Sequence, residues 1–272
     1  MLQNVIIRLS QLVPQSLRSS LAASSYGDRV RATLNRLNRD PFPIVTMNGL
    51  LGGQRMRVNW ANHKTYVFGT HEPHVMQVMK DLVQPGWTAV DVGAHIGYST
   101  LLMAQCVGPP GKVLAFEPLA QNYKLLVENI GLNGHQNISA ENLALMARPG
   151  SIELRSATPG AMTWVASTHL DAAAAVETQT VEGVTLDDYV QRHNIGKIDF
   201  VKMDVEGAEG DVLTGMSAIL KRDKPTLLIE LHAAGGDPEQ HPALLILRAN
   251  DYQITDLGSR NWERHIVATP AN

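Results

Sequence analysis

The chain has 272 residues, of which 44% are hydrophobic and 18% charged, which is typical of a globular protein with a sizeable core. Its net charge is −3 and its basic residues are spread along the chain, so nucleic acid is not expected as a main partner. Because Cys106 is the single cysteine, an internal disulfide is excluded.

The N-terminal segment has the pattern of a helix rather than of a secretion signal. Val5, Leu9, Leu12 and Val13 share one helical face, and Arg8 interrupts what would be the apolar region of a signal. No apolar stretch approaches the roughly 18 residues that span a bilayer. We therefore expect a cytoplasmic protein without stable membrane insertion. Its N-terminal helix would pack on the body of the protein, on a second copy to form a homodimer, or at a membrane surface.

The pattern changes after this segment to short alternating runs and then to a helix. The runs "QRMRVNW" and "TYVFG", set among glycine turns, indicate a small antiparallel hairpin unit. "PHVMQVMKDLV" (Pro73–Val83) follows with helical periodicity. We therefore expect an N-terminal helical and hairpin extension, residues 1–70, and a main domain, residues 71–272.

From Thr88 onward, strand and helix patterns alternate. The strand patterns are "TAVDVG", "KVLAFEP", "ISAEN", "KIDFVKMD", "TLLIELH", "YQITDL" and "ERHIVA". The helix patterns are "YSTLLMAQC", "QNYKLLVENIGLN", "TLDDYVQRH", "AEGDVLTGMSAILKR" and "PALLILRAN". Apolar strands separated by helices predict an α/β fold with a parallel sheet covered on both faces. An insertion, residues 148–184, adds the strand patterns "SIELRS" and "ETQTVEGV", and its alanine run 172–175 could be a helical turn or a loop.

The predicted strands end in polar residues. These strand ends are Asp91, Glu117, Asn142, Asp204 and His232. Since ligands of such sheets bind beyond the carboxyl ends of the strands, near the switch in strand order, these residues outline a candidate site.

The run "VDVGAHIGYST" forms the first strand-to-helix turn. Gly93 and Gly97 allow a tight turn and a close ligand approach, and the following helix offers unpaired N–H groups. The dinucleotide fingerprint G-x-G-x-x-G would need a glycine where this chain has His95, which counts against a pyrophosphate such as that of NAD. We group Ser99, which begins the helix with Tyr98, with this turn as a cofactor-binding residue.

Two acids extend this site. Glu117 ends the next strand, 26 residues after Asp91, where an acid can accept hydrogen bonds from both ribose hydroxyls of a nucleoside. Asp91 could hold a ligand ammonium. Taken singly, Glu117 could be an exposed acid before Pro118 and Asp91 a turn cap. Together they describe a ligand with a ribose, a carboxylate and an amine but no phosphate, and S-adenosylmethionine has these groups.

At this point the chain resembles a family, the FkbM-type methyltransferases, a branch of the class I S-adenosylmethionine-dependent enzymes. The resemblance covers roughly residues 86–234, more than half of the chain. It is carried, in order, by "DVGAHIGYST", "AFEPLAQNYKLLVENIGLN", "TLDDY", "IDFVKMDVEGAEGDVL" and "LLIELH".

The resemblance implies a Rossmann-like, doubly wound, mostly parallel sheet of seven strands with a final antiparallel strand. It implies methyl transfer to a hydroxyl, often of a sugar or a polyketide. Asp91, Gly93 and Gly97 would then line the methionine part of the cofactor, and Glu117 the ribose. By the same resemblance, Asn142 and Ala144 would lie by the adenine and Glu72 near the amino end. The family more often has asparagine where His95 stands.

The run "KMDVEGAEGDVL" gives the catalytic hypothesis. Carboxylates at a strand end can orient or deprotonate an alcohol, so Asp204 and Glu206 are candidates, whereas Asp211 suits the start of a helix. His232, at the end of the neighbouring strand, could be a general base or a structural histidine. Metal dependence is left open, with Asp204 and Glu230 as candidate ligands of a divalent ion.

Three functions are compatible with the sequence. The first is a methyltransferase acting on a hydroxylated small molecule. The second is a nicotinamide-dependent oxidoreductase, against which the missing glycine counts. The third is a non-catalytic nucleoside-binding or scaffold protein, against which the polar ends at Asp204 and His232 count.

Overall fold

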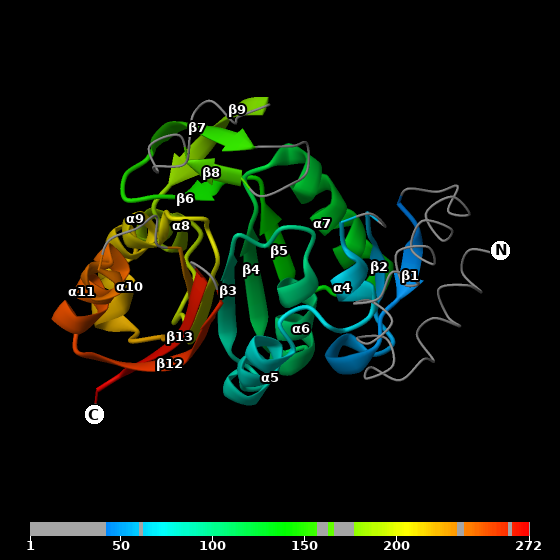
Figure 1. Ribbon diagram of the computed structural model, residues 1–272, viewed down its shortest axis with the longest axis horizontal. Helices are drawn as coiled ribbons and strands as arrows, with labels where there is room; N and C mark the ends of the chain where they lie inside the picture. Colours follow the sequence, from blue (N-terminus) through cyan, green and yellow to red (C-terminus); the bar gives the residue numbers. More distant parts are fainter. Residues whose placement is uncertain are drawn as a thin grey trace.

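A seven-stranded sheet forms the centre of the protein. The computed structural model describes residues 42–59, 62–156, 163–165, 177–232, 237–260 and 263–271. The strands of the central sheet are β3 (Thr88–Val92), β4 (Lys112–Phe116), β5 (Ile138–Glu141), β10 (Phe200–Met203), β11 (Thr226–His232), β12 (Tyr252–Arg260) and β13 (Glu263–Pro270). Their order is β12-β13-β11-β10-β3-β4-β5 (Figure 1). β13 runs in the opposite direction to the other six strands, so the sheet is mostly parallel and the predicted fold class is confirmed.

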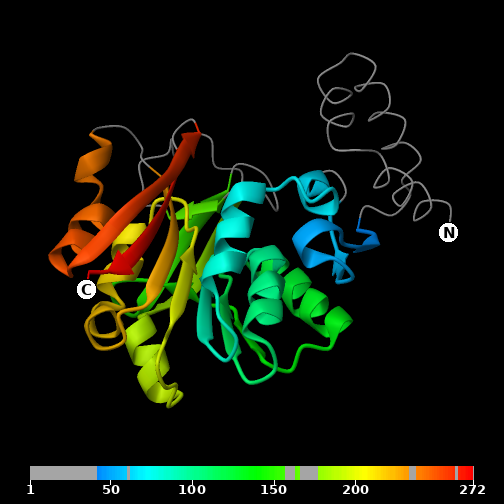
Figure 2. The same ribbon diagram turned by 90° about the horizontal axis from the view of Figure 1, so that it is seen from below.

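Helices cover both faces of this sheet (Figure 2). They are α5 (Pro73–Leu82), α6 (Tyr98–Val107), α7 (Ala120–Asn133), α8 (Leu186–Arg192), α9 (Glu209–Thr214), α10 (Ser217–Arg222) and α11 (Pro242–Ala249). Alternate residues of each strand point to opposite faces, so β10 sends Phe200 into one apolar core and Val201 into the other. The first core packs on α5 and α6, and the second on α8 to α11.

The hairpin unit is confirmed, with one difference. β1 (Ile44–Thr46) pairs antiparallel with β2 (Arg55–Arg57) around the 3₁₀ turn η1 (Gly49–Leu51). The run "TYVFG", expected as a strand, lies largely in the short helix α4 (Lys64–Val67). The side chain of Asn129 in α7 fixes the hairpin to the body, because it accepts from Arg57 N at 2.6 Å and donates to Ile96 O at 2.8 Å.

The predicted helix "AEGDVLTGMSAILKR" is divided into α9 and α10. A side chain at Gly215 would place its Cβ 2.0 Å from Met146 O, so the chain bends where the insertion crosses it. Asp187 then accepts the N–H groups of Ala218 and Ile219 at 2.8 and 3.0 Å, at the start of α10. The break therefore results from a tertiary contact.

The insertion, together with the residues directly before it, forms a second sheet. Its strands are β6 (Ala144–Leu145), β7 (Gly150–Ser156), β8 (Thr163–Val165) and β9 (Glu177–Val184), in the order β6-β9-β7-β8. Both strand patterns predicted here are confirmed. The 3₁₀ turn η3 (Pro238–Gln240) precedes α11. The expected N-terminal helix and the alanine run 172–175 lie outside the described residues.

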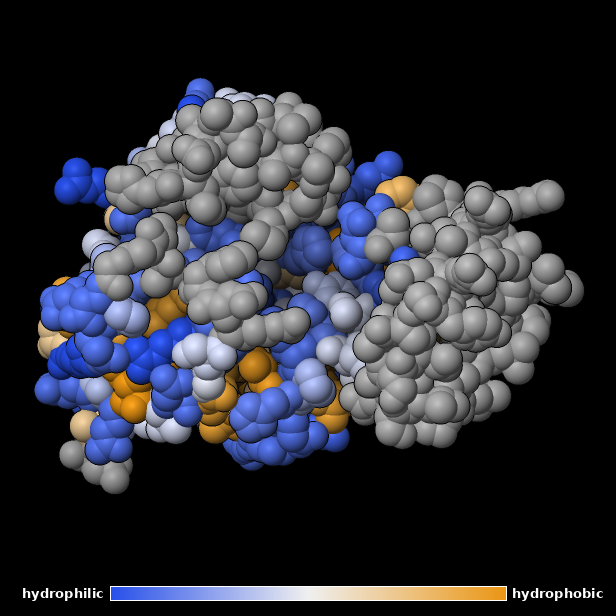
Figure 3. All heavy atoms as spheres, in the orientation of Figure 1, coloured by the Kyte–Doolittle hydropathy of each residue, from blue (hydrophilic) through white to orange (hydrophobic). Residues whose placement is uncertain are grey.

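The core continues from the hairpin into the central sheet. Leu51 and Met56 are fully buried in the same cluster as Leu101 of α6. The division at residue 70 stays a prediction. On the face of Figure 1, the coloured side chains are mostly hydrophilic and the apolar ones form small separate groups (Figure 3). Among the described residues, no helix has the length and apolar character needed to cross a membrane.

Candidate active site

A cavity of about 590 Å³ lies at the carboxyl ends of β3, β4, β10 and β11. The strand order switches here, because β3 lies between β10 and β4, and ligands of such sheets bind at this place. One part of the wall contains Glu117, Leu119, Asn122 and residues 143–146. Another part contains Glu72, Lys202, Asp204, Glu206, Glu230 and Glu263.

The glycine turn brings two strand ends into contact. Gly93 has φ +78°, and a Cβ there would lie 1.9 Å from Asp204 O, so only glycine allows this approach. Gly97 has φ +95°, precedes α6 and packs against Leu126 rather than lining the cavity. His95 lines the cavity and also has a left-handed backbone, with φ +51°.

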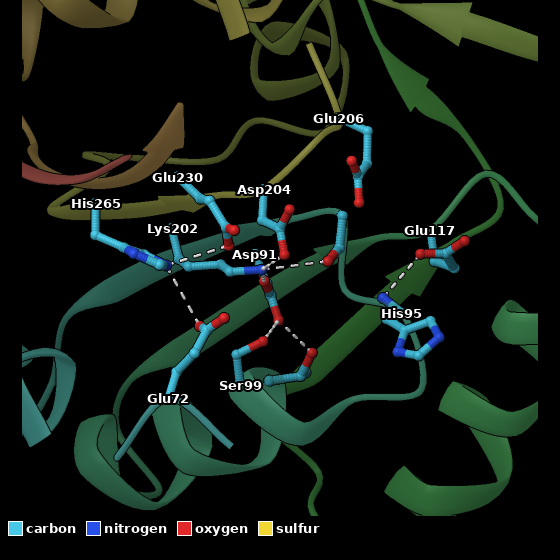
Figure 4. A network of polar contacts seen from close by, with 12 residues as sticks. Glu72, Asp91, His95, Ser99, Glu117, Lys202, Asp204, Glu206, Glu230 and His265 are labelled. Atoms are coloured by element: carbon cyan, nitrogen blue, oxygen red, sulfur yellow. Dashed lines mark hydrogen bonds and ion pairs between the residues drawn. The ribbon is translucent and has the colours of Figure 1, made fainter. Parts of the chain in front are cut away.

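Asp91 is completely buried beneath the cavity. Its Oδ2 accepts hydrogen bonds from Ser99 Oγ at 2.8 Å and Thr100 Oγ1 at 2.6 Å. Its Oδ1 lies 3.7 Å from Lys202 Nζ and makes no hydrogen bond with the described residues. Ser99 lines the cavity, whereas Asp91 does not. Asp91 therefore fixes groups of the wall, including Ser99 and Lys202 (Figure 4).

Glu117 lines the cavity and is held by neutral donors. Its carboxylate accepts from His95 N at 2.8 Å, Leu119 N at 3.0 Å and Asn122 Nδ2 at 3.3 Å. Burial raises the pKa of Glu117, these hydrogen bonds lower it, and the result is about 7. The carboxylate is thus fixed in place at the end of β4.

Asn142 supports the same strand end from outside the cavity. Its Nδ2 donates to Glu117 O at 2.9 Å and Pro118 O at 2.8 Å. Asn142 is not part of the cavity wall, but the adjoining Leu143 and Ala144 are. Of the two residues expected beside the adenine, Asn142 therefore supports the strand end and Ala144 lines the cavity.

Glu72 reaches the cavity from the start of α5. Its backbone is left-handed, with φ +38°, and its carboxylate lies 3.5 Å from His265 Nε2. The same nitrogen lies 3.3 Å from Glu230, so one imidazole of β13 bridges two acids (Figure 4). Burial lowers the pKa of His265, but both carboxylates raise it, to about 10. Burial raises the pKa of Glu72, but His265 lowers it, to about 2. This pair is therefore ionised at neutral pH.

The predicted catalytic residues come together around His232. The Nε2 atom of His232 is 3.4 Å from Glu206, 3.6 Å from Glu230 and 4.0 Å from Asp204. Its Nδ1 donates at 2.9 Å to Glu209, whose side chain is fully buried. Burial lowers the pKa of His232, but the hydrogen bond and the carboxylates raise it, to about 9. Asp204 and Glu206 line the cavity and His232 lies behind them.

Two groups of residues have a donor set that a metal ion could use. One comprises Glu72, Glu230 and His265, and the other Asp204, Glu230 and His232, each with ligand atoms within 4.8 Å of one another. They share Glu230. Nearby carboxylates raise the pKa of each histidine, so binding of a metal ion would have to release a proton from that imidazole.

Several residues of the wall were not expected from the sequence. Lys202 lines the cavity, and its position two residues before Asp204 in a strand could have predicted it. Tyr66 and His71 form a further wall with His63 and His95, and Tyr66 stacks on His63 with ring centroids 5.2 Å apart. No sequence pattern indicated this ring cluster. Burial lowers the pKa of His63 to about 4 and that of His95 to about 3, so both are neutral.

The chain is similar to known methyltransferases. A family model described as "Methyltransferase FkbM domain" matches residues 91–254. "Methyltransferase 1" of Beauveria bassiana is 28% identical over 47% of this chain, and the match spans 57% of that protein's length. "Hexuronic acid methyltransferase AglP" of Haloferax volcanii is 25% identical over 68% of this chain and 72% of its own. A solved methyltransferase FkbM of Methylobacillus flagellatus KT has 16% identity and a TM-score of 0.45, over 75% of this chain and 52% of that one.

Proposed function

The chain belongs to the FkbM family of S-adenosylmethionine-dependent methyltransferases, and we propose that it methylates a hydroxyl of a small molecule. The acceptor proposed is a sugar or a polyketide-type natural product. The observation that carries the proposal is the single cavity with two kinds of carboxylate, Glu117 at one strand end and Asp204 with Glu206 at another. The name of the Haloferax relative supports a sugar-type acceptor.

The residues present suit S-adenosylmethionine, which supplies an electrophilic methyl group when bound. Glu117 would accept the ribose hydroxyls, and Leu143 and Ala144 offer an apolar surface for the adenine. The turn at Gly93 allows close approach of the methionine part, and Glu72 would bind its ammonium. The wall therefore offers this cofactor one acid for the two ribose hydroxyls, a second acid for the ammonium, and an apolar surface for the base.

Methyl transfer breaks a carbon–sulfur bond, forms a carbon–oxygen bond and releases the proton of the hydroxyl. A proton acceptor must therefore be near the hydroxyl. With a pKa of about 9, His232 is already protonated at neutral pH and cannot accept that proton. We propose that Asp204 or Glu206 accepts it, and that His232 positions both carboxylates. Burial raises the pKa of Glu206 to about 7, which suits a base near neutrality.

The proposed reaction uses protein groups alone. The imidazolium of His232 supplies positive charge among Asp204, Glu206 and Glu230, where a divalent ion would otherwise be needed. Activity that persists in a chelator would support this assignment. Activity that is lost in the chelator and restored by Mg²⁺ or Mn²⁺ would instead assign a metal to Asp204 and Glu230.

The decisive experiment is parallel calorimetric titration of the full chain with S-adenosylmethionine, S-adenosylhomocysteine and NADH. We expect the first two to bind and NADH to bind weakly, because His95 occupies the position where a pyrophosphate needs glycine. Methyl transfer to hydroxylated acceptors would then separate an enzyme from a non-catalytic nucleoside-binding protein. Tight NADH binding without binding of the sulfonium cofactor would contradict the proposal.

A further inference from the structure

The wall of the cavity has a strong excess of acidic groups. Among the described residues, six carboxylates and one lysine line it. The carboxylates are those of Glu72, Glu117, Asp204, Glu206, Glu230 and Glu263. A cleft whose charges have one sign concentrates ligands of the opposite sign.

The lysine is engaged with the protein. Lys202 Nζ lies 3.7 Å from Asp91 Oδ1 and 3.6 Å from Asp204 Oδ2, and it donates to Gly93 O at 3.3 Å. Its side chain is only 12% exposed. With one hydrogen bond to Gly93 O and ion pairs to two carboxylates, Lys202 is already neutralised by the protein and offers little to an anionic ligand.

The histidines of the wall do not change this balance. Burial lowers the pKa of His63, His71 and His95, so these rings are neutral at pH 7. His232 and His265 are cations, but neither belongs to the cavity wall. They balance part of the charge from behind the carboxylates. Burial also raises the pKa of Glu117 and of Glu206 to about 7, so these two groups are only partly ionised at neutral pH, and a bound cation would favour their ionised form.

The cofactor accounts for only part of the acidic wall. In the proposed function Glu117 faces the ribose and Glu72 the cofactor ammonium. Asp204, Glu206, Glu230 and Glu263 remain around the space left for the acceptor. Glu206 is a partly buried carboxylate whose cationic partner, His232, is shared with three other acids. An anionic acceptor would add repulsion here, whereas a cationic group would relieve it.

We propose that the acceptor carries a protonated amine beside the hydroxyl that is methylated, as in an amino sugar or an aminocyclitol. The ammonium would lie against Glu206 and Glu263, and the hydroxyl toward Asp204. This inference rests on the proposed function and deepens it by naming the charge of the acceptor. It also predicts that a uronate, which shares the sugar ring but carries a carboxylate, is a poor acceptor, so the acceptor would differ in charge from the hexuronic acid in the name of the Haloferax relative.

The test uses three probes that share one ring and one hydroxyl. They are trans-2-aminocyclohexanol, trans-cyclohexane-1,2-diol and trans-2-hydroxycyclohexanecarboxylate. Each is titrated into the full chain saturated with S-adenosylhomocysteine, in low and high salt and in the presence of a chelator. We expect the amine to bind about 10-fold more tightly than the diol and the carboxylate to bind most weakly. The difference should shrink in high salt, because exposed charge is screened.

Variants connect this preference to the wall. Glu206→Gln and Glu263→Gln should each lower affinity for the amine about 3- to 10-fold. Glu263→Gln, at a residue with no role in the proposed proton transfer, should leave affinity for the diol unchanged. Glu182→Gln is the matched control, since Glu182 is exposed on β9 and does not line the cavity. It should leave the preference unchanged.

The outcomes are separable. An amine that binds no more tightly than the diol would overturn the inference, as would a preference that survives both cavity variants. Tight binding of Mn²⁺ that is lost in Asp204→Asn and that displaces the amine would assign the acidic wall to a metal ion instead. Failure of S-adenosylhomocysteine itself to bind would overturn the proposed function and this inference together.

Discussion

The two halves of the cavity hold their carboxylates in different ways. In the half assigned to the cofactor, Asp91 and Glu117 accept hydrogen bonds from hydroxyl, amide and backbone N–H donors, whereas Glu72 is held by an ion pair with His265. In the half assigned to the acceptor, Asp204, Glu206 and Glu230 meet one another around the imidazolium of His232, and their contacts are ion pairs of 3.4 to 4.0 Å.

The difference separates a preformed surface from a balance of charges. Neutral donors fix a carboxylate whether or not a ligand is bound, so the cofactor half should tolerate changes elsewhere. In the acceptor half each carboxylate depends on its charged neighbours, and removal of one alters all of them. Substitutions in the acceptor half should therefore affect turnover and pH dependence, and those in the cofactor half should affect affinity.

The largest effect is expected for Asp204→Asn. Loss of the carboxylate nearest the glycine turn should lower turnover about 10²- to 10⁴-fold, because a proton acceptor and the partner of Lys202 are both lost. Affinity for S-adenosylhomocysteine should change less than about 3-fold by the same argument. Rates of methyl transfer and calorimetry measure the two quantities. Asp211→Asn is the control, since Asp211 is exposed in the first turn of α9. An equal loss of affinity and turnover would erase the distinction between the halves.

Gly93→Ala should disrupt the contact between the ends of β3 and β10, where the two halves of the cavity meet. Its Cβ would collide with Asp204 O at 1.9 Å, and φ of +78° is itself unfavourable for alanine. We expect a loss of about 3 kcal/mol in the free energy of unfolding, measured by urea titration. Gly53→Ala isolates the backbone strain, because Gly53 has φ +88° and nothing within 4 Å of its Cβ position. That variant should lose about 1 kcal/mol. Equal losses would show that the contact between the strand ends contributes nothing.

His232→Asn should change how stability depends on pH. The folded pKa of His232 is about 9, above the ordinary value of 6.5. Its contribution is therefore fully present below pH 6.5 and is lost as pH rises through 9, for a total of about 3 kcal/mol. Urea titrations at several pH values should show that, between pH 6.5 and 9.5, the free energy of unfolding falls less in the variant than in the unaltered protein. His74→Asn, on an exposed position of α5, is the control. Identical slopes would mean that His232 is not charged in the folded protein.

Most of the fold followed from the sequence, because its elements rest on local patterns. The alternation of apolar strands with helices predicted the parallel sheet, and the period of two in β10 carries enough information to place Lys202 beside Asp204. The break between α9 and α10 could not be predicted, since it depends on Met146, which directly follows β6 and is far from Gly215 in the sequence. The same applies to "TYVFG", whose alternation resembles a strand although it forms α4.

In the site, too, positions set by local sequence patterns were predictable, and those set by contacts between distant segments were not. The places of Glu117 and Asp204 in the cavity wall were predictable because parallel strands end at one edge of the sheet, whereas Asp91 is buried beneath the wall. The pairing of Glu72 with His265 was not, because it joins the start of α5 to the last strand. The positive charge of His232 could not be predicted either, since it depends on a hydrogen bond to the buried carboxylate of Glu209.

The smallest effect is expected in the cofactor half, for Glu117→Gln. Glutamine keeps one acceptor oxygen but replaces the other with an NH₂ group, so one of the N–H groups of His95 and Leu119 loses its acceptor, and the charge that would bind the ribose hydroxyls is lost. Affinity for S-adenosylhomocysteine should fall by about 1–3 kcal/mol with little change in turnover at saturation. Since burial raises the pKa of Glu117 to about 7, the unaltered protein should bind more tightly as pH rises from 6 to 8. The variant cannot ionise at this position, so its affinity should not rise through this titration. Calorimetry at both pH values, with Glu182→Gln as control, measures this; a pH dependence that persists in Glu117→Gln would place the titrating group elsewhere in the cavity.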